Sequence, residues 1–282
     1  MISKYQNLNQ AFVEELADCS ANGTEVKSRG FTQKEKLFCS FLIKDPTDLR
    51  IEVPARRFNE DYAILEWLWY LTSEKEVSNI GKFADIWNKI ADDDNLVESN
   101  YGHYIKPAWY DLVDELLKDR DTRRATCTIN QPYHRWKNPK DYPCTHYIQF
   151  FIREDKLHMG VYMRSNDAVF GFCNDVFTFA LFQQLMLNEL NSRGAKIELG
   201  NYYHSAGSFH VYDRHYSMME KISKNYFQKA RKNGYPVSLE KLVLNPNLTW
   251  PKMEKFISFL NKDLDKEEIS SRIKEIKEII FQ

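Results

Sequence analysis

The apolar pattern of the chain changes its period at Ala125, and this change constrains the fold more than any other feature of the sequence. Beyond it, the runs ATCTIN, THYIQFFI and LHMGVYM alternate or are rich in β-branched and aromatic residues, which is typical of strands. A long apolar helix is expected over 175–193, ended by Gly194, and KIELGNYYHSAGSFHVY returns to a strand pattern. This order predicts an α+β fold in which helices cover a mixed or antiparallel sheet.

Helical periodicity governs much of the N-terminal half and the tail. The expected helices are 6–18, 59–73 with Asn59 as its cap, 105–119, one that begins at Pro251, and one over 265–281. The last helix carries isoleucines on one face: Ile269, Ile273, Ile276 and Ile280. Residues 33–55 are expected to form two strands joined by a turn around Asp45 and Pro46. Because no repeat, low-complexity tract or flexible linker interrupts the chain, we expect a single domain over 1–282, with a helical tail over about 251–282.

The charge balance excludes several classes of function. The 39 lysines and arginines are offset by 40 acidic residues, so no global basic field exists to hold a nucleic-acid polymer. A small anion bound by a few local arginines remains compatible with this balance. No apolar run approaches the length of a membrane span, and the N-terminus lacks a signal pattern, so we expect a cytoplasmic protein without a membrane partner. Five cysteines without CxxC spacing argue against a disulfide framework, and no metal site is expected.

Two residues stand out against an apolar background. Cys144 lies between a proline and a predicted strand in DYPCTHYIQF, where it is either a packing residue or a chemical group. The other cysteines are interpreted as core or bystander thiols: Cys19, Cys39, Cys127 and Cys173. Glu66 lies inside the apolar run ILEWLWYL. A carboxylate there is either exposed on a wet face or buried, and burial requires that it be paired or used.

Arginines and small polar residues gather at the ends of predicted strands. Arg120, Arg123 and Arg124 precede one strand, where they form either a solvated charge cluster or a clamp for a phosphate. Arg164 and Ser165 in YMRSND could extend such a site. Three polar residues surround Gly171 in RSNDAVFGFCND, and any one of Asp167, Asn174 and Asp175 could simply cap the helix that follows.

The run SFHVY contributes a further pair of polar tips. His210 and Tyr212 are two residues apart in a predicted strand and therefore point to the same face. A single histidine is more often structural than catalytic. Two polar tips on one face, close to other polar groups, indicate a pocket.

Seven segments occur in an order that resembles the thymidylate synthase superfamily, which also contains the deoxynucleotide hydroxymethylases. They are EWLWYL (66–71), IWNKIADDDNLVESNYG (86–102), DTRR (121–124), DYPCTHYIQF (141–150), YMRSND, FGFCND and GSFHVY, and the likeness covers about 23–247. It implies a thymidylate synthase-like fold, a homodimer, a pyrimidine deoxynucleoside monophosphate as substrate and 5,10-methylene-tetrahydrofolate as co-substrate.

The resemblance also implies a chemical role for Cys144. It makes this thiol the nucleophile that adds to C6 of a pyrimidine, which turns C5 into a carbon able to attack an electrophilic one-carbon unit. A nearby cation such as Arg164 would lower the pKa of the thiol. Glu66 would act as general acid and base through ordered water.

Binding roles follow from the same resemblance. Within the subunit, the phosphate would be bound by Arg29, Arg164 and Ser165. Two arginines, Arg123 and Arg124, would reach the phosphate in the partner's site. The sugar 3′-hydroxyl would be held by His210 and Tyr212. Asn174 would also bind the substrate, and Asp175 would contact the base as a catalytic residue. The folate would contact Trp87, Asp167 and Gly171.

Departures from the synthase pattern bear on the base and the reaction. Synthases that act on deoxyuridylate typically read GLPFN where this chain reads GFCND, so an asparagine is replaced by Asp175. Asparagine can donate to O4 of uracil and accept from N3–H, whereas an ionised aspartate can only accept, which favours the amino group of cytosine. Ser208 also replaces an aspartate of the synthase pattern. The stretch is most similar to the phage-type deoxycytidylate hydroxymethylases, which add water where a synthase adds hydride.

We therefore expect a dCMP 5-hydroxymethylase. The segments EWLWYL and PC are closer to the synthase pattern and leave open a thymidylate synthase or a hydroxymethylase that acts on dUMP. A catalytically inactive nucleotide-binding homologue is a less favoured alternative. The ending EIKEIIFQ differs from the usual synthase ending, so closure of the tail over the folate does not follow from the sequence.

Overall fold

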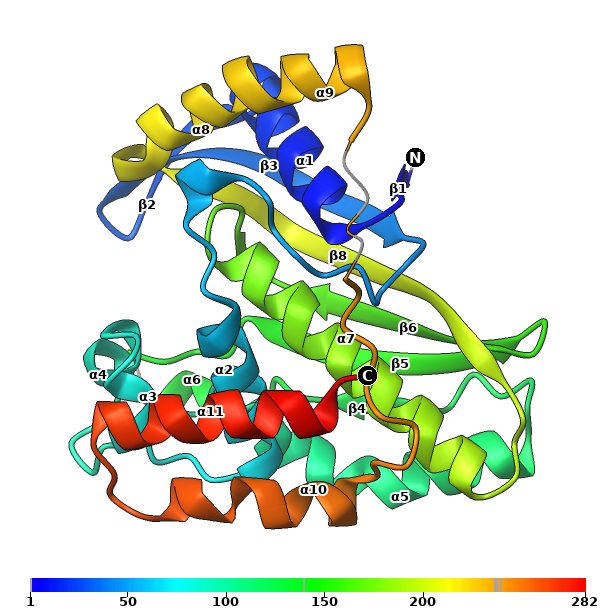
Figure 1. Ribbon diagram of the computed structural model, residues 1–282. Coiled ribbons are helices and arrows are strands. Elements are labelled where there is room, and N and C mark those ends of the chain that lie inside the picture. The colour runs from blue at the N-terminus through cyan, green and yellow to red at the C-terminus, as the bar shows by residue number, and fades with distance from the viewer. Residues whose placement is uncertain (1, 139, 236–237, 239) are drawn as a thin grey trace. The chain divides into compact units, whose positions relative to one another are not determined.

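The computed structural model describes residues 2–138, 140–235, 238 and 240–282. The chain divides into two compact units (Figure 1). The first contains Met1–Asn59, Met159–Ala180 and Gly200–Leu242, and the second contains Glu60–His158, Leu181–Leu199 and Val243–Gln282. Three elements contribute residues to both units, namely β6 (Lys156–Met163), α7 (Gly171–Ser192) and β8 (Glu198–Tyr212). The prediction of a single catalytic domain stays a prediction.

The first unit is built on a sheet with the strand order β1-β3-β8-β6. Its first strand, β1 (Ser3–Tyr5), runs parallel to β3 (Phe31–Ile43), which pairs with β8 in antiparallel register from Gln33↔Tyr212 to Ile43↔Tyr202. The two-residue strand β7 (Asn166–Asp167) lies parallel to β8, with Asp167 opposite His210. This pairing brings two predicted site segments side by side.

A tight hairpin joins β2 (Thr24–Ser28) to β3. Ser28 pairs with Phe31, so the turn consists of Arg29 and Gly30, and both have positive φ, +52° and +86°. Two left-handed residues in a two-residue loop form the turn that matches the twist of antiparallel strands, and glycine adopts that conformation at little cost. Arg29 therefore stands exposed at the tip of a hairpin.

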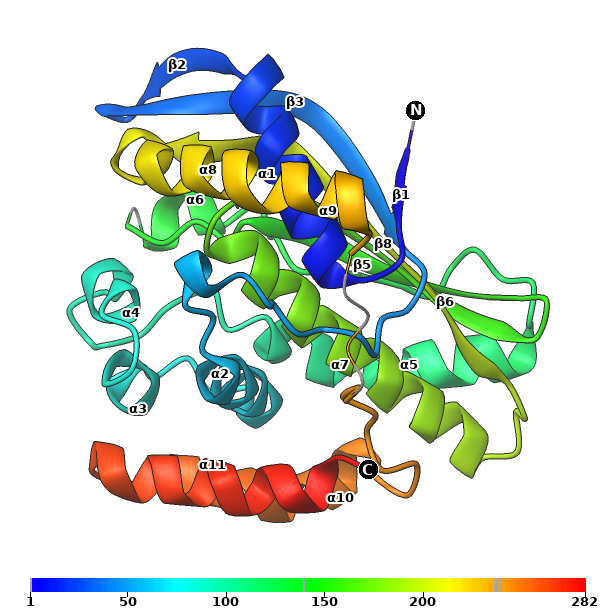
Figure 2. The ribbon, with the colours of Figure 1, turned by 45° about the horizontal axis from the view of Figure 1, so that its top comes forward.

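Helices of the first unit pack beside β3 (Figure 2). α1 (Leu8–Asn22) contacts β3 and α8 (Tyr216–Ile222), and the chain continues through η3 (Ser223–Phe227) into α9 (Gln228–Asn233). Asn7 caps α1 by accepting a hydrogen bond from the backbone N–H of Gln10. The helices of 216–233 were not anticipated from the sequence.

The second unit packs helices around α2 (Glu60–Thr72), which is buried from Ala63 to its end. Its neighbours are α5 (Gly102–Lys118), α10 (Trp250–Ile257) and α11 (Lys266–Ile280). Gly102 permits the approach of α5 to α2, because a Cβ there would lie 1.6 Å from the carbonyl oxygen of Tyr70. The short helices are α3 (Ser78–Gly81), α4 (Ile86–Ile90) and α6 (His134–Lys137). No helix formed by the described residues is long and apolar enough to cross a membrane.

The strands of the second unit follow the order β6-β5-β4. β4 (Thr126–Thr128) and β5 (Thr145–Arg153) are antiparallel, with Thr126 opposite Gln149. Cys144 immediately precedes β5, so the sheet determines where the backbone of this residue lies.

The predicted α+β class and most predicted elements are confirmed. The N-terminal helix, the 59–73 and 105–119 helices, the strands after Ala125 and both tail helices are all present within a few residues of their expected bounds. Pro251 lies in the first turn of α10, and Asp265 opens α11 with a capping box that includes Glu268. The predicted isoleucine face of α11 is buried: Ile269, Ile273, Ile276 and Ile280.

Two expectations about elements are wrong. The second strand in 33–55 does not form, because the chain after Ile43 bonds to a helix start and a loop: Leu8 N–H donates to the Asp48 carbonyl, and Leu242 N–H to the Thr47 carbonyl. A 3-10 turn, η1 (Pro54–Arg56), follows. The apolar helix begins at Gly171, four residues earlier than expected. Asn174 and Asp175 therefore lie inside α7 and do not cap it.

His204 lies in β8 with no exposed surface, and burial lowers the pKa of its imidazole from 6.5 to about 3. Between these values the unfolded chain binds a proton that the folded chain does not bind. The neutral histidine thus contributes stability that is fully present above about pH 6.5 and is lost as the pH falls toward 3.

We expect His204→Gln to flatten the pH dependence of the free energy of unfolding in that window, by up to about 1.4 kcal/mol per pH unit. Urea denaturation at a series of pH values measures this slope. His103→Gln is the control, because His103 is exposed and its substitution leaves the slope unchanged. An identical slope in wild type and His204→Gln would contradict the assignment of a buried neutral imidazole.

Candidate active site

Cys144 differs from the other four cysteines in its exposure. It is half-buried, whereas the other four are buried. Burial raises the pKa of these four thiols, to about 12 for Cys19, about 11 for Cys127 and about 12 for Cys173, and it also raises that of Cys39. Because the thiolate is the nucleophile, the buried thiols are unreactive near neutral pH. The interpretation of them as core thiols is confirmed.

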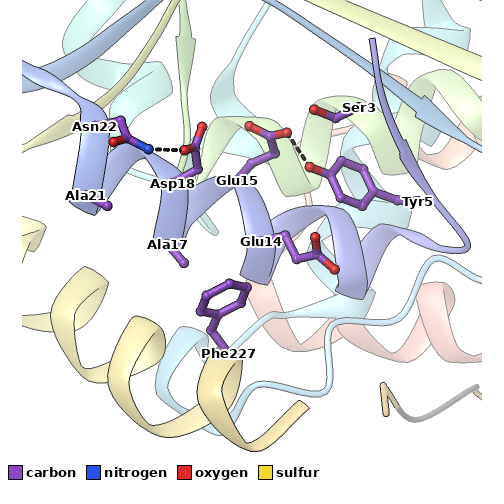
Figure 3. Close-up of a pocket in the computed structure, with 9 residues that line it drawn as sticks. All are labelled: Ser3, Tyr5, Glu14, Glu15, Ala17, Asp18, Ala21, Asn22 and Phe227. Atoms are coloured by element: carbon purple, nitrogen blue, oxygen red, sulfur yellow. Dashed lines mark hydrogen bonds between the residues drawn. The ribbon is translucent and has the colours of Figure 1, made fainter. Parts of the chain in front are cut away.

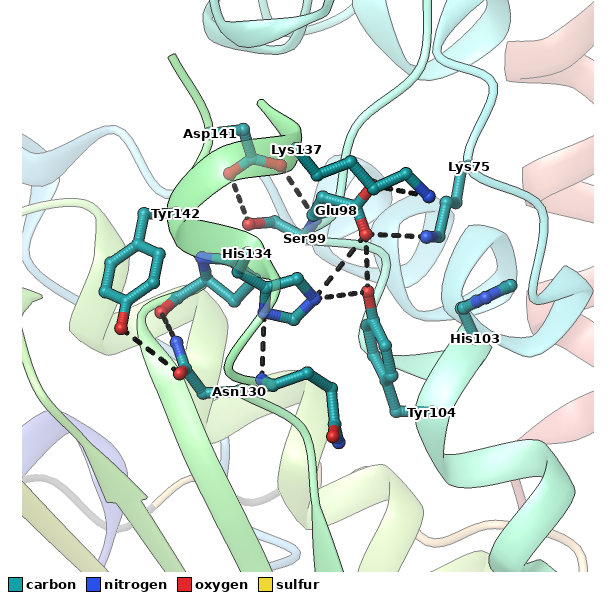
Figure 4. A network of polar contacts seen from close by, with 12 residues as sticks. Lys75, Glu98, Ser99, His103, Tyr104, Asn130, His134, Lys137, Asp141 and Tyr142 are labelled. Carbon is teal, nitrogen blue, oxygen red and sulfur yellow. Dashed lines mark hydrogen bonds and ion pairs between the residues drawn. The ribbon is translucent and has the colours of Figure 1, made fainter. Parts of the chain in front are cut away.

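The backbone just before Cys144 is held by polar contacts from distant segments (Figure 4). Asn130 donates its side-chain N–H to the carbonyl oxygen of Pro143 at 3.1 Å. Asp141 accepts hydrogen bonds from the backbone N–H of Ser99 at 2.8 Å and from its hydroxyl at 2.5 Å. These contacts fix the approach of the chain to Cys144 without using its thiol.

A buried carboxylate organises the adjoining loop. Glu98 is 3% exposed and accepts hydrogen bonds from Lys75 Nζ at 2.6 Å and from the Tyr104 hydroxyl at 2.7 Å. Although burial alone would raise its pKa, these bonds and the contact with Lys137 hold the pKa of Glu98 at about 2. The carboxylate is therefore ionised at any ordinary pH, and it anchors Tyr104 (Figure 4).

His134 extends this network with a defined tautomer. The backbone N–H of Gln131 donates to His134 Nδ1 at 3.0 Å, so the ring proton lies on Nε2, 2.8 Å from the Tyr104 hydroxyl oxygen. Burial lowers the pKa of His134 and keeps the ring neutral. A hollow of about 300 Å³ opens beside it, lined by His134, Arg135, Asn138 and Tyr142.

Glu66 is buried and paired. It is 6% exposed and accepts a hydrogen bond from the Tyr62 hydroxyl at 2.9 Å, so the alternative of an exposed wet-face glutamate is wrong. The oxygen of Tyr62 in turn accepts from Trp87 Nε1 at 2.9 Å. Trp87 also packs against Trp69, with ring centroids 4.8 Å apart. Two predicted site residues, Glu66 and Trp87, thus lie at the two ends of one short hydrogen-bonded chain.

The arginines between α5 and β4 divide into two kinds. Arg120 forms an ion pair with Asp155 at 2.7 Å, which gives it a structural partner. Arg123 and Arg124 are exposed in a loop whose backbone is anchored, because the Arg123 carbonyl accepts from Gln149 and the Arg124 carbonyl from the N–H of Thr126. Their guanidinium groups are on the protein surface.

In the first unit, Asp175 meets a partner that the sequence did not suggest. Asn166 donates its side-chain N–H to Asp175 Oδ2 at 2.8 Å. Gly171 leaves room for this bond, because a Cβ there would lie 3.3 Å from Asn166 Nδ2 and 3.4 Å from Asp175 Oδ2. Asn174 turns elsewhere and accepts from the guanidinium of Arg56 at 3.3 Å.

The contact continues into the sheet. Asn166 Oδ1 lies 2.9 Å from His204 Nε2, and His204 Nδ1 lies 3.1 Å from the hydroxyl of Tyr202. Both His204 and Tyr202 are fully buried. They alternate along β8 as His210 and Tyr212 do, so the same spacing rule could have found them in the sequence.

The second polar pair of β8 has its own support. The rings of His210 and Tyr212 meet edge to face, 4.9 Å between centroids, which confirms that they share a face. The Ser208 hydroxyl donates to Glu35 on β3 at 2.6 Å and lies 3.2 Å from His210 Nδ1. Since the serine proton points to the carboxylate, His210 donates through Nδ1–H and keeps Nε2 as an acceptor. Burial lowers the pKa of His210, so the ring is neutral.

The remaining predicted residues lie along the segment that joins β6 to α7. Arg164 and Ser165 are half-buried between β6 and β7, and the N–H of Ser208 donates to the Arg164 carbonyl at 3.1 Å. Asp167 accepts from the N–H of Val169 at 2.8 Å through Oδ1. This bond shapes the turn that leads into α7.

An acidic hollow of the first unit is unsuited to a phosphate (Figure 3). It has a volume of about 450 Å³, and its lining includes Glu14, Glu15 and Asp18 from α1. Tyr5 donates a hydrogen bond to Glu15 there. Negative charge repels an anionic ligand, so we do not place the substrate in this hollow.

Comparisons with known proteins agree with this fold. Residues 10–248 match a family model described as thymidylate synthase. The deoxycytidylate 5-hydroxymethyltransferase of Enterobacteria phage T4 is 32% identical over 189 residues, 63% of this chain and 77% of that protein. The deoxyuridylate hydroxymethyltransferase of Bacillus phage SP01 is 27% identical over 284 residues, 91% of this chain and 70% of that protein.

A solved structure supports the fold independently. Thermostable thymidylate synthase A from Bacillus subtilis aligns with a TM-score of 0.64 at 20% identity, over 77% of this chain and 84% of that one. At that identity the likeness concerns the fold, while the family model covers most of the chain. The chain therefore belongs to the thymidylate synthase family, whose members are transferases that add one-carbon units to C5 of pyrimidine nucleotides.

Proposed function

We propose that this protein is a dCMP 5-hydroxymethylase that uses 5,10-methylene-tetrahydrofolate. The observation that carries the proposal is the state of residue 175: an aspartate whose Oδ2 accepts a hydrogen bond from Asn166. A carboxylate in that position can accept from a base but cannot donate to one. The T4 relative, named for deoxycytidylate, supports the same substrate.

The base is selected by donors and acceptors. Cytosine presents an amino group at C4, which donates to the carboxylate of Asp175. Uracil presents O4, an acceptor, which a carboxylate repels. When a thiolate adds at C6, the cytosine ring gains basicity at N3, and a negative charge beside a protonated N3 stabilises that form.

Cys144 supplies the nucleophile. Its sulfur forms a bond to C6, and the electron pair of the C5–C6 double bond becomes available at C5, which attacks the one-carbon unit. Loss of the C5 proton and departure of tetrahydrofolate leave an exocyclic methylene on the base. Addition of water there, with release of the thiol from C6, yields the hydroxymethyl product without any oxidation of the folate.

Glu66 serves the proton transfers of this sequence. Its hydrogen bond from Tyr62 orients the carboxyl group, and Trp87 orients Tyr62 in turn. A carboxyl group held in this way can pass protons through a water molecule to and from the base.

The folate supplies a one-carbon unit at the oxidation level of formaldehyde when it is bound. The chemistry of Trp87, Asp167 and Gly171 fits a flat pterin, because an indole offers an aromatic surface, a carboxylate accepts from ring N–H groups and a glycine permits close approach. Trp87 is 7% exposed, so only a small part of it is available for contact.

The phosphate and sugar are assigned as in the family. Arg29, Arg164 and Ser165 bind the phosphate within the subunit, and the exposed pair Arg123 and Arg124 binds it in the partner's site of a homodimer. Guanidinium groups suit this task because they bind phosphate oxygens in pairs. His210 and Tyr212 hold the 3′-hydroxyl, and Nε2 of His210 accepts a hydrogen bond from this hydroxyl.

A hydroxymethylase acting on dUMP is the second candidate. It is favoured by the SP01 relative, which is named for deoxyuridylate and aligns with 91% of this chain. Both candidates share the thiol addition and the water step, and they differ at the base. Residue 175 is therefore the position at which the two candidates are tested.

We expect wild-type protein to convert dCMP to its 5-hydroxymethyl product with release of tetrahydrofolate. Asp175→Asn should lower the ratio of kcat/KM for dCMP to that for dUMP by about 10- to 100-fold, because it removes a charge-assisted acceptor. The mass of the product identifies it, and the absorbance of the folate gives kcat/KM for each substrate. Asp155→Asn is the matched control at an exposed aspartate and keeps the ratio. A methyl product from dUMP with dihydrofolate would refute the proposal and indicate a synthase.

Cys144 should become covalently labelled by a 5-fluoropyrimidine deoxynucleotide in the presence of the folate. A fluorine at C5 replaces the proton whose loss normally allows the covalent adduct to break down and release the enzyme. Cys144→Ser should abolish the label and lower kcat by at least about 10³-fold. Cys39→Ala keeps both, since Cys39 is a buried thiol. Intact-mass spectrometry reads the label, and turnover retained by Cys144→Ser would exclude the nucleophile role.

Ser208→Ala should raise KM by about 3- to 10-fold with a smaller change in kcat. The reason is that the substitution breaks the link from Glu35 to His210, so the ring loses the acceptor that fixes its tautomer. Ser205→Ala on the same strand is the control, because Ser205 bonds to Ser40 instead. Equal kinetics for the two variants would show that the link does not orient His210 for substrate.

A further inference from the structure

We infer that Asn166, His204 and Tyr202 are positioning residues that lock Asp175 as a hydrogen-bond acceptor and thereby set the preference for a 4-aminopyrimidine. This inference rests on the proposed function, in which Asp175 reads the base. None of the three residues needs to touch the substrate. They act through the orientation and charge of one side chain.

The contacts form a hydrogen-bonded chain that runs from the sheet to the helix. Tyr202 and His204 stand on β8, Asn166 on β7 and Asp175 on α7. The links measure 3.1 Å from Tyr202 to His204, 2.9 Å from His204 to Asn166 and 2.8 Å from Asn166 to Asp175. Each is of hydrogen-bond length. The site-facing end is thus joined to the fully buried residues of β8.

The chemistry of the side chains determines which group donates and which accepts at each link of this hydrogen-bonded chain. An ionised Asp175 can only accept, so Asn166 presents its NH2 to Asp175 and its oxygen to His204. The oxygen requires a donor, so His204 carries its proton on Nε2 and accepts at Nδ1. Tyr202 therefore donates its hydroxyl proton to Nδ1. In this arrangement each of the three links joins one donor to one acceptor.

The reverse arrangement leaves a buried group without a partner. If residue 175 presented a donor to Asn166, the amide would turn over, His204 would carry its proton on Nδ1, and the Tyr202 oxygen would accept. Within the described part of the chain the Tyr202 hydroxyl has no acceptor besides His204, so its proton would remain unpaired. An unsatisfied buried donor disfavours that state by roughly tenfold or more.

The rings around His204 keep it in place. Phe41 stacks on it with an interplanar angle of 9°, and Phe172 meets it edge-on with centroids 5.4 Å apart. The imidazole has no contact with solvent, because it is fully buried. The donor role of Tyr202 therefore determines the donor and acceptor roles of His204 and Asn166, and so which group Asn166 presents to Asp175.

The functional consequence concerns selection between bases. With Oδ2 committed to Asn166, the carboxylate is held at one orientation and remains an acceptor throughout turnover. A 4-amino group is complementary to it, and a 4-oxo group is not. A purely structural role for Asn166 would instead predict equal losses for both bases when the residue is changed.

The test measures kcat/KM for dCMP and dUMP in wild type and in Asn166→Ala. We expect the dCMP:dUMP ratio to fall about tenfold in the variant, through loss for dCMP and little change for dUMP. The acid limb of the dCMP profile should move to higher pH, because a carboxylate that loses a donor binds a proton more readily. Tyr202→Phe, which preserves shape, should lower the ratio by a few-fold and keeps the test valid should Asn166→Ala not fold.

Matched controls separate positioning from stability. Asn79→Ala removes another buried asparagine, which donates to the carbonyls of Leu260 and Lys262, and Tyr5→Phe removes another buried tyrosine hydroxyl. Both should leave the base ratio unchanged. Parallel losses for the two bases in Asn166→Ala and Tyr202→Phe, with wild type still selective for dCMP, would overturn the inference and leave the proposed function intact. A wild type that prefers dUMP would overturn both.

Discussion

The hydrogen bond from Asn166 to Asp175 is the interaction on which the proposed base preference depends. It joins a two-residue strand to the second turn of α7, and it forms because α7 begins at Gly171 and because β7 lies beside β8. A glycine at the start of the helix leaves room for both side chains. Local backbone geometry thus holds a carboxylate at the position where the synthase pattern has an asparagine.

The two departures from the synthase pattern have each acquired a partner from elsewhere in the fold. Asp175 is held by Asn166, which is supported by His204 and Tyr202. The Ser208 hydroxyl donates a hydrogen bond to Glu35 on β3 and lies next to His210 Nδ1. His210 is therefore linked through Ser208 to a carboxylate of a neighbouring strand. Substituted positions with matching partners are more consistent with a changed substrate than with decay of an inactive relative.

The second unit also pairs its buried charge, in the loop that bonds to the segment before Cys144. Charged groups are costly to bury unless they are paired, and Glu98 is paired three times over with Lys75, Tyr104 and Lys137. Ser99, the residue after Glu98, bonds through its N–H and hydroxyl to Asp141 in the loop before Cys144. The backbone on the N-terminal side of Cys144 is thus held by side chains to which the proposed mechanism assigns no chemical role.

The sequence by itself determined the α+β class, the order of the elements, the buried isoleucine face of α11 and the shared face of His210 and Tyr212, because all of these follow from local periodicity. Motif order also pointed to the family and to Cys144. Only the tertiary structure decided that Glu66 is buried and paired, that 44–56 forms no strand, and that Asp175 lies within α7. It alone supplied Asn166, His204 and Glu35, because a hydrogen-bond partner on another strand leaves no periodic trace in the chain.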